Sequence, residues 1–354
     1  KPRAMDYGQT NPKPNPLRIV FFGSVADFKL VGQKIEKGVN LNPEIKGSWK
    51  FESDKVLTFE PESEWPIGQK VTFSLENTLF ADSVTLSKHS ETFETDGFSV
   101  SVADSEFNQH PTIPKEKKGI VSLKFNYPVD PVSLSNNVSA ELVDEMNNSK
   151  NVRFTIHYGQ NFTSAYIHSE FLAIPKRDSV LKVVVNKGIK SSLVGSPSDS
   201  KISAKINVPG MYNYFKISDI STEVIRNEKF EPEQVLIITT TAPARSADVA
   251  KNLTFSLLPK IKSTKNYDSE VWNSPGEVTA KIREDLAPIE WELIPSEFEN
   301  SQMHSFRFKA PVSRYGLVTV SKGVKSFGDY VLADTYEEII KIPKFSKELL
   351  IMHN

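Results

Sequence analysis

The chain has 354 residues, of which 38% are hydrophobic and 25% are charged, and its formal net charge at pH 7 is −1. A chain of this length is expected to form two or three domains, and its near-neutral charge argues against binding to nucleic acid or to an anionic membrane surface, both of which need a basic excess. Cysteine is absent, which excludes a disulfide framework, a thiol nucleophile and a cysteine-ligated metal site in these residues.

The chain begins with a polar, proline-rich stretch over residues 1–16. It has no signal-peptide core, so we predict either a linker or the start of a chain from which a targeting segment has been removed. No apolar run in the sequence approaches the roughly 18 residues of a membrane-spanning helix. The chain stops just after a hydrophobic, strand-like start over residues 344–354, which we interpret as the beginning of a following domain. We therefore expect a fragment of a longer protein.

The most informative block spans residues 47–75 and predicts three short strands with two connections. Its apolar residues alternate with polar ones, beginning with Trp49 and Phe51, which is the period of two typical of half-buried strands. Serine, aspartate, proline and glycine residues between the strands supply the turns. Trp49 is in phase with Phe51 and is predicted to lie in the core.

Three stretches of the chain share one plan, with an apolar strand at the start and an alternating strand at the end. The opening strands are 17–22, 120–129 and 235–243, and the closing strands are 92–98, 204–208 and 339–343. The strand before the last leads into similar segments, Lys187-Gly188-Ile189-Lys190-Ser191 in the second stretch and Lys322-Gly323-Val324-Lys325-Ser326 in the third. A period of roughly 110–130 residues suits whole domains in tandem rather than a solenoid.

We predict an all-β chain of three tandem β-sandwich domains of the immunoglobulin or fibronectin-III kind, over residues 17–98, 99–210 and 211–343. Short helical turns are expected near 130–135 and 247–252, where the strand pattern lapses. The acidic, proline-containing stretch 284–300 is expected to be an insertion or a long loop in the third domain.

The sequence shows no catalytic constellation. None of the six histidines lies at metal-ligand spacing from another: they are His89, His110, His157, His168, His304 and His353. His157 and His168 are predicted to face each other across a hairpin, as a structural pair without a third ligand. Carboxylates also recur two residues apart, as on one solvated face of a strand: Glu62/Glu64, Glu52/Asp54 and Glu290/Glu292. Phosphate-binding glycine loops, a GxSxG elbow and an EF-hand loop are missing.

We assign no catalytic, cofactor-binding or metal-ligating residue, and we expect the chain not to be an enzyme. Of the remaining tryptophans, Trp65 is predicted to close a turn over the sandwich edge. Trp272 and Trp291 lie in loop-like sequence and are the better candidates for a contact surface. Glycosylation sequons are about as frequent as chance would give; they begin at Asn137, Asn147, Asn161 and Asn252.

The first domain resembles the N-terminal region of bacterial alpha-2-macroglobulin-like proteins. The resemblance is carried by Gly47–Trp49, Ser53–Pro61 and Trp65–Gln69, and in the second domain by Ala165–Ser169 and Val208–Gly210. It runs from about the first strand to the C-terminus. It implies a large cell-envelope protein, in the periplasm or envelope of a Gram-negative bacterium, built of many macroglobulin-type β-sandwich domains.

Proteins of this family are thought to trap proteases, by rearranging around a protease that has cut a bait segment. Some members also carry a thioester for covalent capture. Neither feature can be assigned to these residues, so the resemblance implies a scaffold whose partners are the other domains of the same chain and, through regions outside it, proteases. The alternative is an adhesin or envelope scaffold of immunoglobulin-like modules. A third reading is the accessory region of a glycoside hydrolase.

Overall fold

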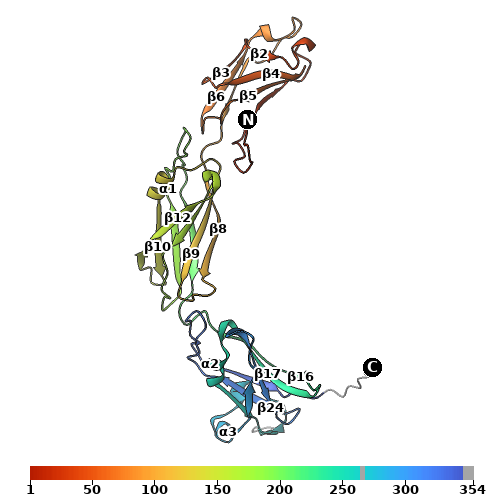
Figure 1. Ribbon diagram of the computed structural model, residues 1–354, viewed down its shortest axis with the longest axis vertical. Helices are drawn as coiled ribbons and strands as arrows, with labels where there is room; N and C mark the ends of the chain where they lie inside the picture. Colours follow the sequence, from red (N-terminus) through yellow and green to blue (C-terminus); the bar gives the residue numbers. More distant parts are fainter. Residues whose placement is uncertain (264–267, 346–354) are drawn as a thin grey trace, which may run out of the picture.

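The computed structural model describes residues 1–263 and 268–345. In this part of the chain, six antiparallel sheets of three or four strands and one two-stranded ribbon form three β-sandwiches along a curved, elongated molecule (Figure 1). The predicted all-β class with three tandem sandwiches is therefore confirmed. No helix in the described ranges is long and apolar enough to cross a membrane. His353 and residues 346–354 of the predicted following domain lie outside the described residues.

The first sandwich packs a four-stranded sheet, in the order β1-β5-β4-β2, against a three-stranded sheet, in the order β3-β6-β7. Its elements are β1 (Leu17–Val20), η1 (Phe28–Leu30), β2 (Lys34–Ile35), β3 (Val39–Asn42), β4 (Gly47–Ser53), β5 (Val56–Pro61), β6 (Lys70–Leu75), η2 (Asn77–Leu79) and β7 (Ser90–Glu94). Trp49 pairs with Phe59 across the β4–β5 hairpin, and both rings are buried in one core. The block 47–75 thus forms the predicted strands β4, β5 and β6, and Trp49 lies in the core as expected.

The second sandwich packs β11-β10-β14-β15 against β12-β13-β9-β8. Its elements are β8 (Val100–Gln109), β9 (Lys117–Phe125), α1 (Pro131–Asn137), β10 (Val138–Asp144), β11 (Ser149–Asn151), β12 (Phe154–Tyr158), η3 (Gln160–Phe162), β13 (Ser164–Ser169), β14 (Ser179–Val185) and β15 (Ile202–Val208). The two sheets approach closely at Gly119, where an added Cβ would lie 2.2 Å from Leu181 Cδ2. The expected helical turn near 130–135 is confirmed as α1, which Asp130 caps through the backbone N–H of Val132.

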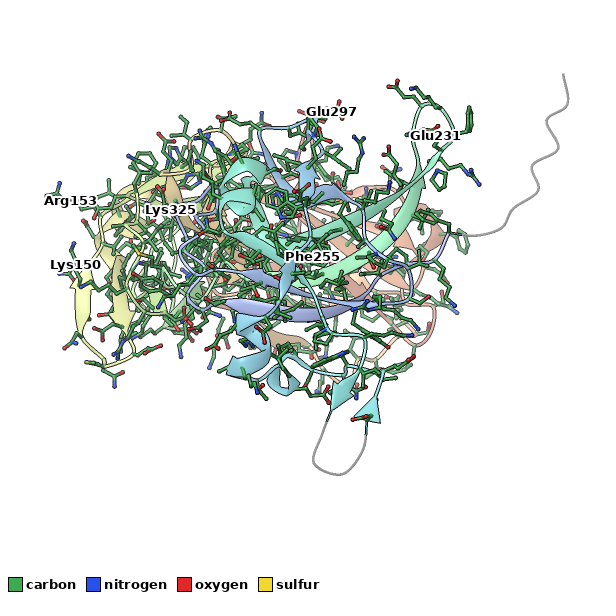
Figure 2. The ribbon with its side chains drawn as sticks, turned by 90° about the horizontal axis from the view of Figure 1, so that it is seen from below. Lys150, Arg153, Glu231, Phe255, Glu297 and Lys325 are labelled. Atoms are coloured by element: carbon green, nitrogen blue, oxygen red, sulfur yellow. The ribbon has the colours of Figure 1, made fainter. Side chains whose placement is uncertain are left out.

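The third sandwich packs β16-β17-β23-β22 against β21-β18-β24-β25, and a ribbon of β19 and β20 lies beside them. Its elements are β16 (Ile217–Arg226), β17 (Pro232–Arg245), α2 (Ser246–Lys251), β18 (Leu253–Leu257), β19 (Lys262–Ser263), β20 (Asp268–Ser269), η4 (Pro275–Glu277), α3 (Ala280–Glu284), β21 (Ala287–Pro288), β22 (Trp291–Leu293), β23 (Asn300–Phe308), β24 (Tyr315–Val320) and β25 (Tyr336–Lys341). The hairpin of β16 and β17 projects from the body, with Glu231 near its tip (Figure 2).

Two expectations about the third sandwich have different outcomes. The helical turn near 247–252 is confirmed as α2. The stretch 284–300 is not a plain loop, because it contains β21 and β22, which are edge strands of the two facing sheets. These strands have only two and three residues. That is too short for an alternating pattern to show in the sequence.

Candidate functional site

The predicted histidine pair exists, but it does not form a metal site. His157 on β12 and His168 on β13 lie with ring centroids 4.9 Å apart in an edge-to-face arrangement. Partial burial, followed by the charges of His157 and Lys118, lowers the pKa of His168. Within residues 1–263 and 268–345, no three His, Cys, Asp or Glu side chains are grouped so that they could hold a metal ion.

His304 lies in the third core beside a serine. Its Nδ1 is 2.9 Å from Ser246 Oγ, and its Nε2 is 3.5 Å from Thr240 Oγ1. Both His304 and Ser246 are buried, and burial lowers the pKa of His304 to about 4. A serine beside a histidine is the beginning of a nucleophile–base pair, but a pair enclosed in the core cannot meet a substrate. We therefore assign it a structural role.

The tryptophans do not form a shared contact surface. Trp65 lies between Phe59 and Phe93, one ring from each sheet, and closes the first sandwich as predicted. The prediction for Trp272 is wrong, because this residue is only 3% exposed and its Nε1 donates to the carbonyl of Pro259. Trp291 belongs to strand β22 rather than a loop, is half-buried and packs edge-on against Phe306.

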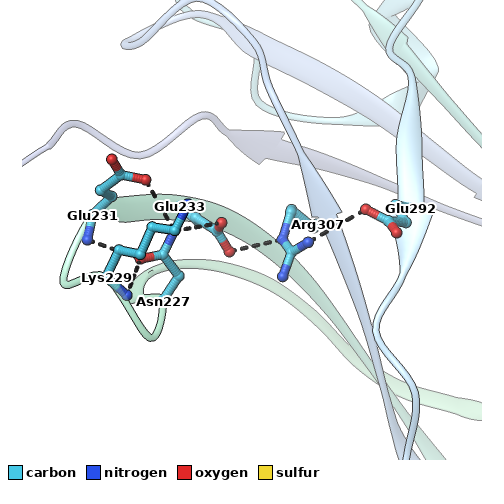
Figure 3. A network of polar contacts seen from close by, with 6 residues as sticks. All are labelled: Asn227, Lys229, Glu231, Glu233, Glu292 and Arg307. Carbon is cyan, nitrogen blue, oxygen red and sulfur yellow. Dashed lines mark hydrogen bonds and ion pairs between the residues drawn. The ribbon is translucent and has the colours of Figure 1, made fainter.

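Three of the paired carboxylates, Glu52, Glu64 and Glu292, bind donors of the same chain. Glu292 accepts from Arg307, which also binds Glu233 at 2.7 Å and so ties the turn end of the β16–β17 hairpin to β22 and β23 (Figure 3). At the tip, the Asn227 side chain bonds Glu231 and Glu233. These contacts stabilise a surface hairpin.

Because no catalytic arrangement is found among the residues that the structure describes, the junctions between sandwiches are the candidate functional features. The first junction is built on Ile67, which belongs to the turn after β5 but is fully buried in the core of the second sandwich. Ile67 forms a parallel bridge to Gly195, where an added Cβ would lie 2.4 Å from Ile67 Cβ. Phe98, at the end of the connection, stacks on Phe125 in the same core.

The N-terminal segment, residues 1–16, contacts both sides of this first junction. The Met5 N–H and the Tyr7 hydroxyl donate to Glu64 Oε2 at 2.7 and 3.1 Å in the first sandwich. On the second sandwich, Asn161 Nδ2 donates to the Tyr7 carbonyl at 2.6 Å, and the Tyr7 ring lies edge-on to Tyr127. The segment therefore bridges the two sandwiches instead of hanging free.

The second junction is built on Met211 and on a lysine. The Met211 N–H donates to the Pro175 carbonyl of the second sandwich, and its carbonyl accepts from Val331 N–H of the third. Lys117, at the start of β9, is only 1% exposed. Its Nζ donates to the Pro114 carbonyl and lies 5.4 Å from the ring centroid of Tyr330.

Sequence reasoning places the domain boundaries at 98/99 and 210/211, but it missed the contacts that Ile67 and Lys117 make across the junctions. Ile67 stands in a Trp-Pro-Ile-Gly turn, where an apolar side chain between Pro66 and Gly68 was the one available signal. Lys117 stands in a run of charged residues that reads as a solvated strand start. Nothing in its local sequence indicates that the side chain is buried.

Similarity to known proteins covers nearly the whole chain. The chain is 25% identical over 359 residues to an alpha-2-macroglobulin homolog of Yersinia pestis, which covers 99% of the chain. It is 28% and 24% identical to the alpha-2-macroglobulins of Rickettsia conorii and Pasteurella multocida, which cover 92% and 97% of it. The predicted resemblance to bacterial alpha-2-macroglobulins is thus confirmed. The chain spans 18% of the length of each of these relatives.

No protein-family model matches the chain. Among solved structures, native alpha-2-macroglobulin from Escherichia coli, spanning domains MG0-NIE-MG1, is similar at a TM-score of 0.24 and 10% identity, covering 69% of this chain and 71% of that one. The chicken CNTN1 FN1-FN3 domains are similar at a TM-score of 0.22 and 10% identity, with 97% and 98% covered. At these scores the superpositions carry no argument about function.

Proposed function

We propose that this chain is a non-catalytic scaffold section of a bacterial protease trap similar to the alpha-2-macroglobulins. The observation that carries the proposal is the similarity to three bacterial alpha-2-macroglobulins along 92% to 99% of the chain. In such a protein, these three sandwiches would form part of the framework that surrounds the protease, and other parts of the longer polypeptide would contact the protease.

The junctions supply the physical support for a scaffold role. A free linker between sandwiches would let them tumble independently. Here Ile67 is buried in the neighbouring core, and Met211 is bonded to both of its neighbours. Each sandwich therefore affects the placement of the next, as a scaffold requires.

We also propose that the protein lies in the periplasm or cell envelope. Its release by osmotic shock would support that location.

The decisive experiment uses the full-length protein that contains this chain. After limited proteolysis, we expect cleavage at one exposed segment to change the mobility on native gels and to leave the protease bound. Unchanged mobility together with free protease would contradict the proposal. The control is the 354-residue chain alone, which we expect not to inhibit the same protease. Inhibition by this chain would show that it is more than a scaffold.

A further inference from the structure

The two junctions differ in how fully their buried polar groups are hydrogen-bonded. At the first junction, the Tyr127 hydroxyl donates to the Asp96 carbonyl at 3.2 Å. Asn126 Nδ2 donates to the Gly97 carbonyl at 2.8 Å, and its Oδ1 accepts from Ser99 N–H at 2.8 Å. With Ile67 buried in the second core as well, this junction combines apolar packing with satisfied polar groups.

At the second junction, two buried polar groups are incompletely hydrogen-bonded. Lys117 carries three donor hydrogens, and the Pro114 carbonyl accepts one of them. Among the described residues, no carboxylate forms an ion pair with it. The Tyr330 hydroxyl, on the aromatic ring below the ammonium group, is buried and has no hydrogen-bond partner in the part of the chain that the structure describes.

These two groups destabilise the arrangement in which the second and third sandwiches pack against each other, which is called the closed form here. A buried ammonium without a carboxylate partner loses hydration that one carbonyl and one ring replace only in part, and an unbonded buried hydroxyl adds to the cost. Burial accordingly lowers the pKa of Lys117, while the charge of Asp329 acts in the opposite direction. Both groups would regain water if the second and third sandwiches moved apart.

The connection between these sandwiches has a defined pivot and room beside it. Met211 is bonded through its N–H to Pro175 and through its carbonyl to Val331, at 2.8 and 2.9 Å. A groove of about 1020 Å³ opens next to this connection, lined from the second sandwich by residues such as Phe107 and from the third by Tyr214. The groove leaves room for a rotation at Met211, although Ile174 of the second sandwich also packs against the third core at this junction.

We propose that the junction between the second and third sandwiches is a joint, in which Met211 is the pivot and the burial of Lys117 against Tyr330 favours opening. The first junction is the fixed one. This inference concerns the chain itself and does not rest on the protease-trap function. In a protein that rearranges, it assigns the movement to one place along the chain.

The test measures distance distributions with pairs of spin labels. Because the chain has no native cysteine, labels attach only where cysteine is introduced. Lys46→Cys with Lys187→Cys spans the first junction, and Lys150→Cys with Lys322→Cys spans the second; all four lysines are exposed. We expect one narrow distribution across the first junction and a broader or two-component distribution across the second.

The Lys117→Met substitution then removes the buried charge and keeps most of the side-chain volume. We expect the open population at the second junction to fall about tenfold, because the variant has no buried ammonium group whose hydrogens are left incompletely bonded in the closed form. Tyr330→Phe removes only the unbonded hydroxyl and is expected to shift the distribution in the same direction. Lys115→Met, an exposed lysine two residues away, is the matched control and is expected to change nothing.

Equal widths at the two junctions, or a distribution that Lys117→Met leaves unchanged or broadens, would overturn the proposal. If Lys117→Met fails to fold, Tyr330→Phe decides the question, because it keeps the ring that packs in the third core. A Tyr330→Phe variant with an unchanged distribution would then count against the joint.

Discussion

His304 shows how a polar ring is kept inside a β-sandwich. The ring is fully buried on β23, with Ser246 Oγ 2.9 Å from its Nδ1. A charged imidazole in that position would lose its hydration, so burial favours the neutral ring and lowers its pKa to about 4. Because an unfolded histidine has a pKa near 6.5, the unfolded chain takes up this proton more readily than the folded chain does.

The stability of the third sandwich should therefore fall in acid. Above a pH of about 6.5 the ring is neutral in both the folded and the unfolded state, so it does not affect the free energy of unfolding. Between about pH 6.5 and 4 the unfolded state is protonated first, so the free energy of unfolding falls by up to about 3 kcal/mol. Urea unfolding of wild type and His304→Gln across this range would measure the difference. The exposed His89, changed to Gln, is the control and should keep the wild-type pH dependence. An identical slope in His304→Gln would contradict the assignment.

At the scale of elements, the sequence repeat in the second and third sandwiches corresponds to one repeated turn. Gly188 and Gly323 adopt φ of +96° and +101°, a left-handed conformation that residues with a Cβ rarely adopt. The residue after each glycine, Ile189 or Val324, is buried in its core. The closing serines also form equivalent bridges, Ser191 to Val129 and Ser326 to Ala244.

Because of this repeated turn, we expect a substitution by alanine at either glycine to lower the stability of its sandwich. Gly188→Ala and Gly323→Ala should each destabilise their sandwich by about 1–2 kcal/mol, because a Cβ strains the left-handed backbone. Around Gly323 no atom lies within 4 Å of the added Cβ, so the cost there comes from the backbone alone. Gly23→Ala, with open space and no left-handed φ, is the control. Denaturant midpoints measure all three, and a Gly323→Ala variant as stable as Gly23→Ala would contradict the prediction.

The elements that could be predicted are those with one face in a core. The block 47–75 alternates clearly because β4 and β6 bury alternate side chains, and because the apolar residues Leu57 and Phe59 of β5 lie two apart, with the buried Thr58 between them. Strands β8 and β16 were not predicted, although each has ten residues. Both are edge strands with many half-exposed positions, so their apolar residues are too few to mark a period.

At the scale of the whole molecule, Ile67 makes the first and second sandwiches depend on each other. It belongs by sequence to the first, between β5 and β6, and by packing to the second, where it is fully buried. A residue of this kind transmits a loss of stability across a domain boundary. Val71, four residues further along the chain, is equally buried but packs in the core of the first sandwich.

Ile67→Ala and Val71→Ala therefore form a matched pair. Each removes buried methyl groups and should cost about 2–4 kcal/mol. We expect Ile67→Ala to speed hydrogen exchange of backbone amides in β9 and β13 of the second sandwich, whereas Val71→Ala should speed exchange in β5 and β6 of the first. If Ile67→Ala weakened protection in the first sandwich only, the coupling through this residue would be refuted.

The sequence by itself determined the fold class, the number of sandwiches and the resemblance to bacterial alpha-2-macroglobulins. These follow from local alternation and from short motifs such as Trp65–Gln69, which are written in consecutive residues. The tertiary structure alone decided that Ile67 fills a neighbouring core, that residues 1–16 bridge two sandwiches and that Lys117 is buried against Tyr330. Those contacts join residues that are remote in the sequence, and no local pattern records which side chains meet when separate sandwiches pack end to end.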